Sequence, residues 1–146
     1  MELSLNNTNS ILLLDDESDI ATTLKQGLEK LDFQVYSFTD PLLALEHFRI
    51  DSKQFRLVIS DLRMPGMNGY EFLKTVKKIK PEVKVFLMTA FEIDKAEFRR
   101  VLNSVKIDEF IQKPISFKHL ARMVSEHIII QKKPRHEYQR YVGQYV

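Results

Sequence analysis

Acidic residues in this sequence stand directly after apolar segments. Asp15 and Asp16 follow the segment ILLL, and Asp61 follows LVIS, while Lys113 stands at the end of FIQK. A carboxylate can attack phosphorus and form an acyl phosphate, and a metal ion with a lysine can stabilise the transferring oxygens. The residue types therefore indicate phosphoryl transfer onto a carboxylate, provided that the fold brings them together.

The charges of these residues suggest which metal is needed. Three carboxylates in one place repel one another, and burying them is costly unless positive charge compensates. Lys113 supplies one positive charge, and a divalent cation would supply two more. The sequence has no cysteine and the candidate ligands are oxygens, so Mg²⁺ is the expected cofactor, with Mn²⁺ as a substitute. Thr89 adds a hydroxyl at the end of another apolar segment, VFLMT.

These side chains can meet only if the apolar segments are neighbouring strands. Five short segments have the length and composition of strands: Ile11–Leu14, Phe33–Phe38, Leu57–Ser60, Val83–Met88 and Glu109–Ile111. The first does not alternate in polarity, which indicates a strand buried on both faces. Apolar residues at helical spacing follow each strand. The pattern predicts an α/β fold, a doubly wound five-stranded parallel sheet with helices on both faces and a site at the carboxyl ends of its strands.

The predicted helices begin at recognisable residues. Asp40 followed by Pro41 is a helix cap with proline at the first helical position, and Asn68 with Glu71 resembles a capping box. Ser116 stands where the last helix is expected to begin. The stripe after Pro41 consists of Leu42, Leu45 and Phe48. Four lysines are interpreted as the solvated face of the helix after Asn68: Lys74, Lys77, Lys78 and Lys80.

The composition is that of one globular domain. The chain has 146 residues, of which 44% are hydrophobic and 29% charged, and no apolar segment approaches the roughly 18–20 residues of a membrane span. The N-terminus has neither the basic nor the apolar part of a signal peptide, which favours the cytoplasm and no membrane partner. We expect an N-terminal extension at residues 1–9, a domain at 10–130 and a basic, tyrosine-containing tail at 131–146.

The net charge of +2 is concentrated in the tail, which holds four basic residues and one acidic residue. The remainder is close to neutral, so nucleic acid is not expected as a partner. In the tail, helical spacing relates Tyr138, Tyr141, Val142 and Tyr145. The tail could dock on the domain, dimerise, bind a partner, begin a linker or remain disordered in solvent.

Four motifs carry a resemblance to a known family. The segments ILLLDDE, VISDLRMPGMNGYEFL, VFLMTA and FIQKP resemble the receiver domain of two-component response regulators, and the resemblance extends over residues 10–130. It implies the flavodoxin-like (βα)5 receiver fold and a phosphorylation-controlled signalling switch, which is not a turnover enzyme. It also implies a histidine kinase or phosphotransfer protein as the donor of the phosphoryl group.

The resemblance implies a role for each site residue. Asp61 would accept the phosphoryl group, Asp16 would bind Mg²⁺ directly, and Asp15 would bind it through a water. The backbone carbonyl of Arg63 would be a further ligand. Lys113 would pair first with the acceptor carboxylate and then with the phosphoryl group.

The resemblance also implies a switch. Thr89 would turn toward the phosphoryl group, and Phe110 would move inward behind it. This change would alter the surface of the fourth helix, the strand at 109–111 and the last helix, where a downstream protein would bind. The Lys113–Pro114 peptide bond would be cis, as is typical of such domains.

One segment departs from the family pattern, and two further residues stand at positions that vary within the family. The segment from Phe91 to Asp108 is longer than the spacing common in the family and has SVKIDEF where a Gly-Ala pair often stands. Arg63 and Phe91, each two residues after a site residue, stand at positions that tune the lifetime of the phosphoryl group. Because Phe91 is bulky and apolar, we hypothesise that it shields the phosphoryl group from water and slows self-dephosphorylation.

The sequence leaves alternatives. We expect a stand-alone receiver that acts by protein contact, and the alternatives are a receiver whose output domain is absent from this chain or a partner-binding module that works without phosphorylation. A dehalogenase-like phosphatase would need an aspartate where Arg63 stands, and a flavodoxin-like cofactor binder would need a phosphate loop in place of DDESDI. More simply, Asp15, Asp16 and Glu17 could cap a helix, and Phe110 could be a core residue.

Overall fold

The computed structural model describes residues 9–90, 96, 99–100 and 105–128. The elements follow in the order β1 (Ser10–Leu14), α1 (Ser18–Glu29), β2 (Gln34–Phe38), α2 (Pro41–Ile50), a short 3₁₀ helix η2 (Ser52–Gln54), β3 (Phe55–Asp61), α3 (Gly69–Ile79), β4 (Lys84–Thr89), β5 (Glu109–Gln112) and α5 (Phe117–His127). All five predicted strands are observed, with slightly different boundaries. Most of the helix predicted between β4 and β5 lies outside the described residues, among which residues 96 and 99–100 are helical. The tail and almost all of the N-terminal extension also lie outside them.

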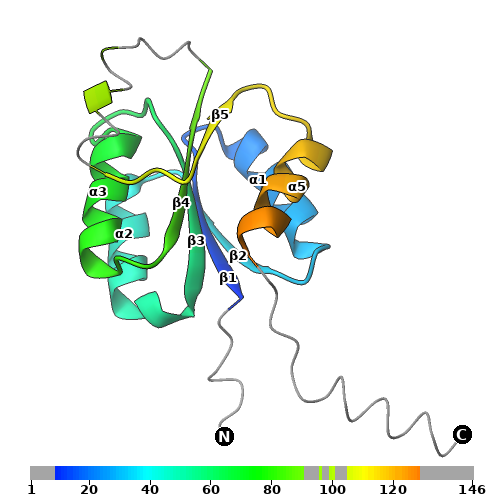
Figure 1. Ribbon diagram of the computed structural model, residues 1–146, viewed down its shortest axis with the longest axis horizontal. Coiled ribbons are helices and arrows are strands. Elements are labelled where there is room, and N and C mark those ends of the chain that lie inside the picture. The colour runs from blue at the N-terminus through cyan, green and yellow to red at the C-terminus, as the bar shows by residue number, and fades with distance from the viewer. Residues whose placement is uncertain (1–8, 91–95, 97–98, 101–104, 129–146) are drawn as a thin grey trace, which may run out of the picture.

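The five strands form one parallel sheet in the order β2-β1-β3-β4-β5. Helices α2 and α3 cover one face, and α1 and α5 cover the other (Figure 1). The doubly wound fold predicted from the sequence is therefore confirmed. Strand β1 lies between β2 and β3, and all five of its residues are buried, which explains why its sequence does not alternate in polarity.

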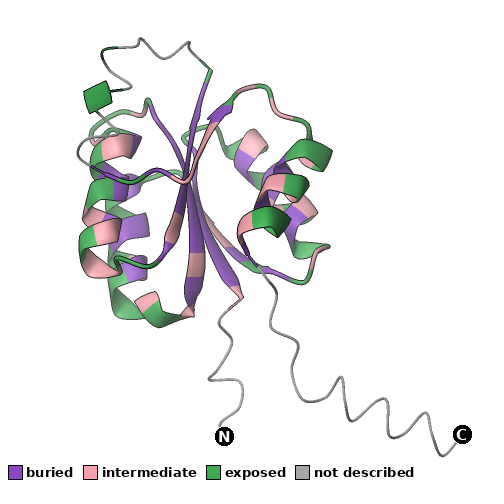
Figure 2. Ribbon diagram, viewed as in Figure 1, coloured by how far each residue is buried: buried purple, intermediate pink, exposed green. Residues whose placement is uncertain are grey.

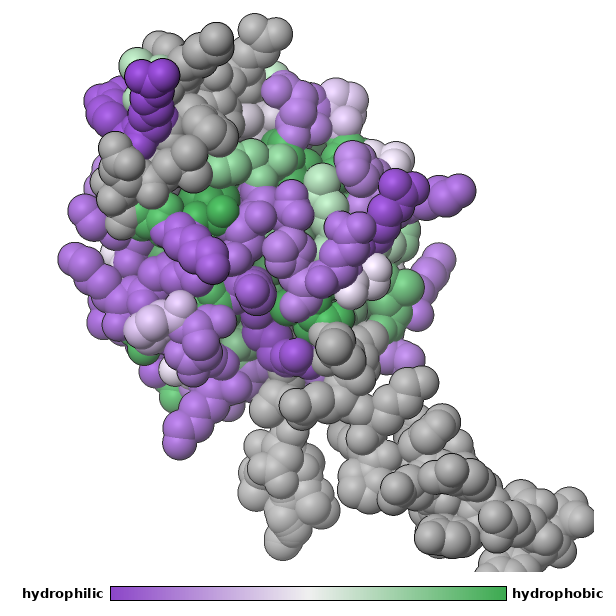
Figure 3. Space-filling model, viewed as in Figure 1, coloured by the Kyte–Doolittle hydropathy of each residue, from purple (hydrophilic) through white to green (hydrophobic). Residues whose placement is uncertain are grey.

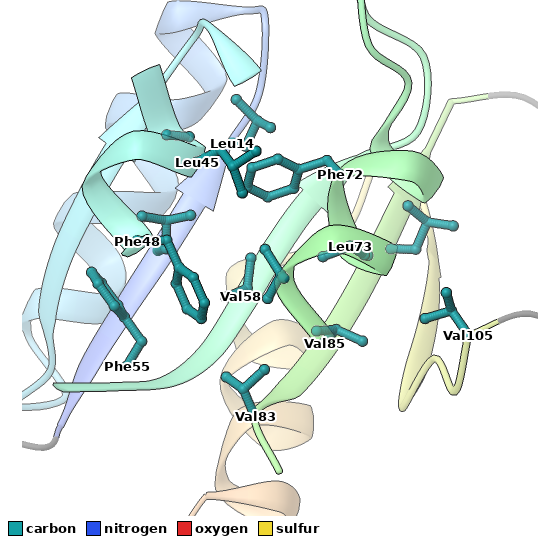
Figure 4. Packing of buried hydrophobic residues seen from close by; sticks show 14 of the residues in the cluster. Leu14, Leu45, Phe48, Phe55, Val58, Phe72, Leu73, Val83, Val85 and Val105 are labelled. Atoms are coloured by element: carbon teal, nitrogen blue, oxygen red, sulfur yellow. The ribbon is translucent and has the colours of Figure 1, made fainter. Parts of the chain in front are cut away.

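Each face of the sheet has its own hydrophobic core. Leu12 and Leu14 of β1 pack on the side of α2 and α3, whereas Ile11 and Leu13 pack on the side of α1 and α5. Figure 4 shows the first core, in which buried side chains of α2, α3, the sheet and the connections before β4 and β5 fill the space between the layers: Leu14, Leu45, Phe48, Phe55, Val58, Phe72, Leu73, Val83, Val85 and Val105. Fully burying side chains of this size contributes about 1.5–3 kcal/mol each, which fixes the strands that position the site.

Helix α2 departs from its predicted apolar stripe. Leu45 and Phe48 are buried as expected, together with Ala44, but Leu42 is 63% exposed. Leu42 is therefore not a core residue. The sequence predicts Leu42 in the core because it precedes Leu45 by three residues, a spacing that is typical of one helical face. The sheet instead covers the side of α2 that carries Ala44, Leu45 and Phe48.

The predicted helix starts are observed. The Asp40 side chain accepts a hydrogen bond from the Leu42 N–H at 2.9 Å, and the Asn68 side chain accepts one from the Glu71 N–H at 2.8 Å. The Ser116 hydroxyl accepts a hydrogen bond from the His119 N–H at 3.1 Å. Each bond satisfies a backbone donor that the first turn of a helix leaves free.

Two of the four lysines interpreted as a solvated face are half-buried, and their ammonium groups donate to backbone carbonyls. The Lys80 ammonium donates to three backbone carbonyls, those of Ser52, Lys53 and Phe55, at 3.1, 3.2 and 2.5 Å. The Lys77 ammonium donates to the Val83 carbonyl at 2.6 Å. Burial lowers the pKa of both lysines. Lys74 and Lys78 are not part of these contacts, and Lys74 is exposed as predicted.

In the described domain, buried side chains face the sheet and mostly hydrophilic side chains face solvent. Helices α2 and α3 have buried inner sides and largely exposed outer sides (Figure 2). Hydrophilic residues cover most of the described surface on the face that Figure 3 shows. Within the described residues, no helix combines the length and apolar character required to cross a membrane.

Candidate functional site

The sheet brings the predicted site residues to one edge. Leu14 of β1 and Ser60 of β3 are paired in register, so the residues that follow them lie side by side: Asp15, directly after β1, and Asp61, the last residue of β3. In the next strand, Met88 of β4 pairs with Asp61, and Thr89 ends that strand. The carboxyl ends of parallel strands point the same way, so these groups share one edge of the sheet.

Lys113, which follows β5, reaches across this edge. Its ammonium nitrogen lies 2.9 Å from Asp15 Oδ2, 3.2 Å from Asp61 Oδ2 and 3.6 Å from Glu17 Oε1. The side chains of Lys113, Asp15 and Asp61 are nearly or fully buried, whereas that of Glu17 is exposed. The first two contacts are charge-assisted hydrogen bonds between buried groups, which are stronger than bonds between neutral groups.

Four carboxylates gather around this lysine. Asp15, Asp16, Glu17 and Asp61 each offer an oxygen, and these oxygens lie within 4.8 Å of one another. Three carboxylates were expected from the sequence, and the structure adds Glu17. The signal was present, because Glu17 directly follows the aspartate pair. One ammonium leaves three negative charges uncompensated, and a divalent cation would reduce them to one. An all-oxygen, strongly negative cluster fits a hard cation such as Mg²⁺.

The environment of Asp61 changes its acidity. Burial, opposed by the charge of Lys113 and reinforced by the charge of Asp15, raises the pKa of Asp61 from 3.8 to about 6. Burial disfavours the charged form of Lys113 as well, but its hydrogen bonds and charge interactions with Asp15 and Asp61 raise its pKa overall. Lys113 is therefore a cation across the physiological range, and Asp61 is an ionised carboxylate above about pH 6.

The backbone around Asp61 is held tightly. The Ser60 hydroxyl donates to the Asp61 carbonyl oxygen at 2.9 Å, and the Leu62 N–H donates to Asp61 Oδ1 at 3.1 Å. The Gly69 N–H donates to the Leu62 carbonyl at 2.7 Å. A Cβ atom on Gly69 would overlap the Asp61 carbonyl, so only glycine fits there. Ser60 and Gly69 were not predicted as site residues, although the glycine ends the segment MNG within one of the four motifs.

Asp15 has two roles in the structure. Its Oδ1 accepts a hydrogen bond from the Glu17 N–H at 2.9 Å, while its Oδ2 contacts Lys113. Glu17 itself makes no side-chain cap at the start of α1. The simpler interpretation of these acids as helix caps is therefore insufficient for Asp15, because the same carboxylate belongs to the lysine cluster.

The residues implied in the switch lie on neighbouring strands, Thr89 at the end of β4 and Phe110 within β5. Thr89 is buried, and its carbonyl accepts a hydrogen bond from the Lys113 N–H at 2.7 Å. Phe110 is half-buried and packs against the core on the side of α2 and α3. The Lys113–Pro114 peptide bond is cis, as the resemblance implied. Arg63 is exposed after the end of β3, and Phe91 lies outside the described residues.

Comparison with known families identifies this arrangement. The sequence matches the family model of the response regulator receiver domain over residues 11–125. The chain belongs to this family. Receiver domains are signalling switches of two-component systems and, in general, are not turnover enzymes.

Several curated proteins are similar to the chain in sequence. It is 37% identical over 117 residues to the transcriptional regulatory protein ZraR of Klebsiella oxytoca, covering 80% of this chain and 25% of that protein. It is 31% identical over 96 residues to sporulation initiation phosphotransferase F of Bacillus subtilis, covering 65% of this chain and 76% of that protein. The chain also spans half the length of regulatory protein VanRB of Enterococcus faecalis, to which it is 29% identical.

Solved receiver structures share the fold. A CheY-like receiver domain protein from Methanospirillum hungatei superposes with a TM-score of 0.73 at 27% identity, covering 81% of this chain and 91% of that chain. The non-phosphorylated HemR receiver domain from Leptospira biflexa gives the same TM-score and identity, covering 85% of this chain and 97% of that chain. These structures agree with the five-stranded parallel sheet described above.

Proposed function

We propose that this receiver domain is a phosphorylation-controlled switch of a two-component phosphorelay and accepts a phosphoryl group on Asp61. The observation that carries the proposal is the position of Asp61 Oδ2, which lies 3.2 Å from the Lys113 ammonium inside a cluster of carboxylates. A histidine kinase or a phosphotransfer protein is the proposed donor. Relatives of the chain include proteins named as a sporulation phosphotransferase and as the sensor kinase CckA of Brucella abortus.

In the proposed transfer, an oxygen of the ionised Asp61 carboxylate attacks the phosphorus of a phosphohistidine. The new O–P bond forms as the N–P bond breaks, and the imidazole leaves. Lys113 neutralises charge on the carboxylate and then on the phosphoryl oxygens, and its contact with Asp15 holds it in place. The Leu62 N–H orients the carboxylate through Oδ1.

The acid cluster would hold the metal. Asp16 is the proposed direct ligand together with Asp61 and the Arg63 carbonyl, and Asp15 is proposed to bind through a water. When bound there, Mg²⁺ supplies positive charge that offsets the negative phosphoryl oxygens. Glu17 adds negative charge beside these ligands, which strengthens the attraction of the site for a cation.

Phosphorylation is proposed to change the conformation of one surface of the domain. Thr89 would turn toward the phosphoryl group, and Phe110 would move inward, which would change the face formed by the fourth helix, β5 and α5. A downstream protein would bind that face. The proposal also includes a cytoplasmic location and domain limits at residues 10–130.

The lifetime of the phosphoryl group is proposed to depend on Arg63 and Phe91. If Phe91 shields the group from water, Phe91→Ala will lose its phosphoryl group faster than the parent protein. Decay of the phosphorylated protein, followed by intact mass, measures this directly. An equal or slower decay in the variant would contradict shielding.

The function is tested by incubating the full chain with acetyl phosphate and Mg²⁺ and measuring its intact mass. We expect a gain of one phosphoryl group, which Asp61→Asn abolishes. Asp19→Asn is the matched control, because Asp19 is an exposed acid of α1 outside the cluster. A parent protein that gains no phosphoryl group from acetyl phosphate or from a phosphorylated histidine phosphotransfer domain would contradict the proposal.

A further inference from the structure

Helix α2 has an apolar outer face. Within the described part of the chain, the exposed large hydrophobic side chains are Leu42, Leu43 and Ile50, at 63%, 56% and 78% exposure. All three belong to this one helix, whose opposite side is anchored in the core by Leu45 and Phe48. Exposed apolar side chains gathered on one element indicate a contact surface more often than singly scattered ones do.

The spacing along α2 places these residues on one side. Leu43 and Ile50 are seven residues apart, which is two helical turns, so they lie one above the other. Leu42 and Arg49 have the same spacing and lie beside them. Glu46 stands between the two rows, and both Glu46 and Arg49 are exposed. The outer face of α2 thus combines three apolar side chains with one acid and one base.

We propose that this face is the contact surface of a homodimer, in which the α2 helices of two copies pack antiparallel about a twofold axis. In that arrangement, Leu43 of one copy meets Ile50 of the second, and Ile50 meets Leu43, because these positions lie at equal distances from the centre of the face. Glu46 of each copy comes near Arg49 of the other, so the charges are complementary. A surface that complements itself is what a twofold dimer requires.

The dimer does not depend on the proposed phosphoryl transfer. Leu42, Leu43, Glu46, Arg49 and Ile50 are not members of the acid cluster. We therefore expect Asp61→Asn to dimerise like the parent protein. Three large apolar side chains per copy make a small contact, so the dissociation constant should be weak, on the order of 0.1 mM.

Sedimentation equilibrium of the full chain, from about 10 μM to 1 mM, tests the proposal across the expected dissociation constant. We expect a monomer–dimer equilibrium, which Leu43→Glu and Ile50→Glu each weaken at least ~10-fold because a charge in the apolar contact must be desolvated. Thr22→Glu is the control, since it adds the same charge at an exposed position of α1, away from the α2 face. A protein that stays monomeric throughout, or a dimer that both α2 variants leave unchanged, would overturn the proposal.

A charge exchange tests the antiparallel arrangement of the two α2 helices. Glu46→Arg and Arg49→Glu should each weaken self-association, because each gives the two facing surfaces like charges. An equimolar mixture of the two variants should associate as a heterodimer at least as tightly as the parent protein. A mixture that remains as weak as either variant alone would overturn the antiparallel α2 dimer.

Discussion

The ammonium of Lys113 lies 3.2 Å from Oδ2 of Asp61, although the two residues are 52 positions apart in the chain. The same ammonium lies 2.9 Å from Oδ2 of Asp15, which is 98 positions away. Lys113 thus joins the ends of β1, β3 and β5 through one cation. Removing this ammonium would leave the buried carboxylates of Asp15 and Asp61 without a cationic partner, which should lower the free energy of unfolding.

Lys113→Met should destabilise the metal-free protein. Asp15 is fully buried and would lose its cationic partner, and removing one member of a buried ion pair typically costs about 3–5 kcal/mol. Urea unfolding at pH 8 in the presence of a chelator measures the loss. Lys118→Met is the control, because Lys118 is exposed on α5 and its replacement should change stability by no more than ~0.5 kcal/mol. Equal stabilities for the two variants would contradict the importance of the Lys113 contacts.

Asp61 should make the metal-free protein less stable as the pH rises. Its pKa is raised from 3.8 to about 6 in the folded state, so the folded protein holds this proton more tightly than the unfolded chain does. The contribution to stability is full below the unfolded pKa and is lost as the pH rises through about 6.

Asp61→Asn removes this pH dependence, because its amide does not ionise. We expect the variant to be more stable than the parent by about 2 kcal/mol at pH 8, with a difference that shrinks toward pH 4. Urea unfolding across this range in a chelator is the measurement. A variant that is equally destabilised at both pH values would show that Asp61 is not held at a raised pKa.

Mg²⁺ should stabilise the folded protein through the acid cluster. Binding to the folded state alone adds about 2.7 kcal/mol when the free ion is 100-fold above its dissociation constant. Asp16→Asn removes an exposed cluster carboxylate and should reduce the rise in Tm that Mg²⁺ produces, whereas Asp19→Asn should leave it unchanged. Thermal unfolding with and without Mg²⁺ provides the comparison. A full response in Asp16→Asn would exclude Asp16 as a ligand.

Gly69→Ala should damage the site and the fold together. The new Cβ would overlap the Asp61 carbonyl oxygen and come close to the Ser60 hydroxyl, so the β3–α3 connection would have to move. We expect a loss of about 3 kcal/mol or more in unfolding free energy and slower phosphorylation by acetyl phosphate.

Gly66→Ala is the matched control for this prediction. Gly66 has a φ of 87°, but a Cβ added there would meet no atom within 4 Å, so its replacement should cost only backbone strain of about 1–2 kcal/mol. If Gly66→Ala destabilised the protein more than Gly69→Ala, the close approach at Gly69 would not be the limiting contact.

Lys80→Met should destabilise the protein more than Lys74→Met. The Lys80 ammonium holds three carbonyls, those of Ser52, Lys53 and Phe55, and hydrogen bonds to a charged group contribute roughly 1.5–3 kcal/mol. Lys74 is exposed on α3, the helix that ends just before Lys80, so its replacement should be nearly neutral. Denaturant unfolding of the two variants compares them directly. A similar small effect for both would indicate that the carbonyls find equivalent partners without the lysine.

The sequence by itself determined the elements and the composition of the site. Apolar segments of strand length and stripes of helical spacing predicted the parallel sheet, because backbone geometry fixes which residues share a face. Asp15, Asp61 and Thr89 could be placed at strand ends for the same reason. The caps at Asp40 and Asn68 were also predictable, because capping depends on residues only two or three positions apart.

The tertiary structure alone decided the contacts between distant residues. It placed Glu17 in the acid cluster and the Lys80 ammonium among backbone carbonyls. It also left Leu42 exposed to solvent, although the sequence pattern predicted a core residue. Leu42 and Ala44 both stand at helical spacing from Leu45 or Phe48, so periodicity alone cannot tell which of the two the sheet will cover. The 3.2 Å contact between Lys113 and Asp61 depends on the order of the strands and on the course of the chain after β5. Local sequence patterns do not encode these distances, because they result from the packing of the whole domain.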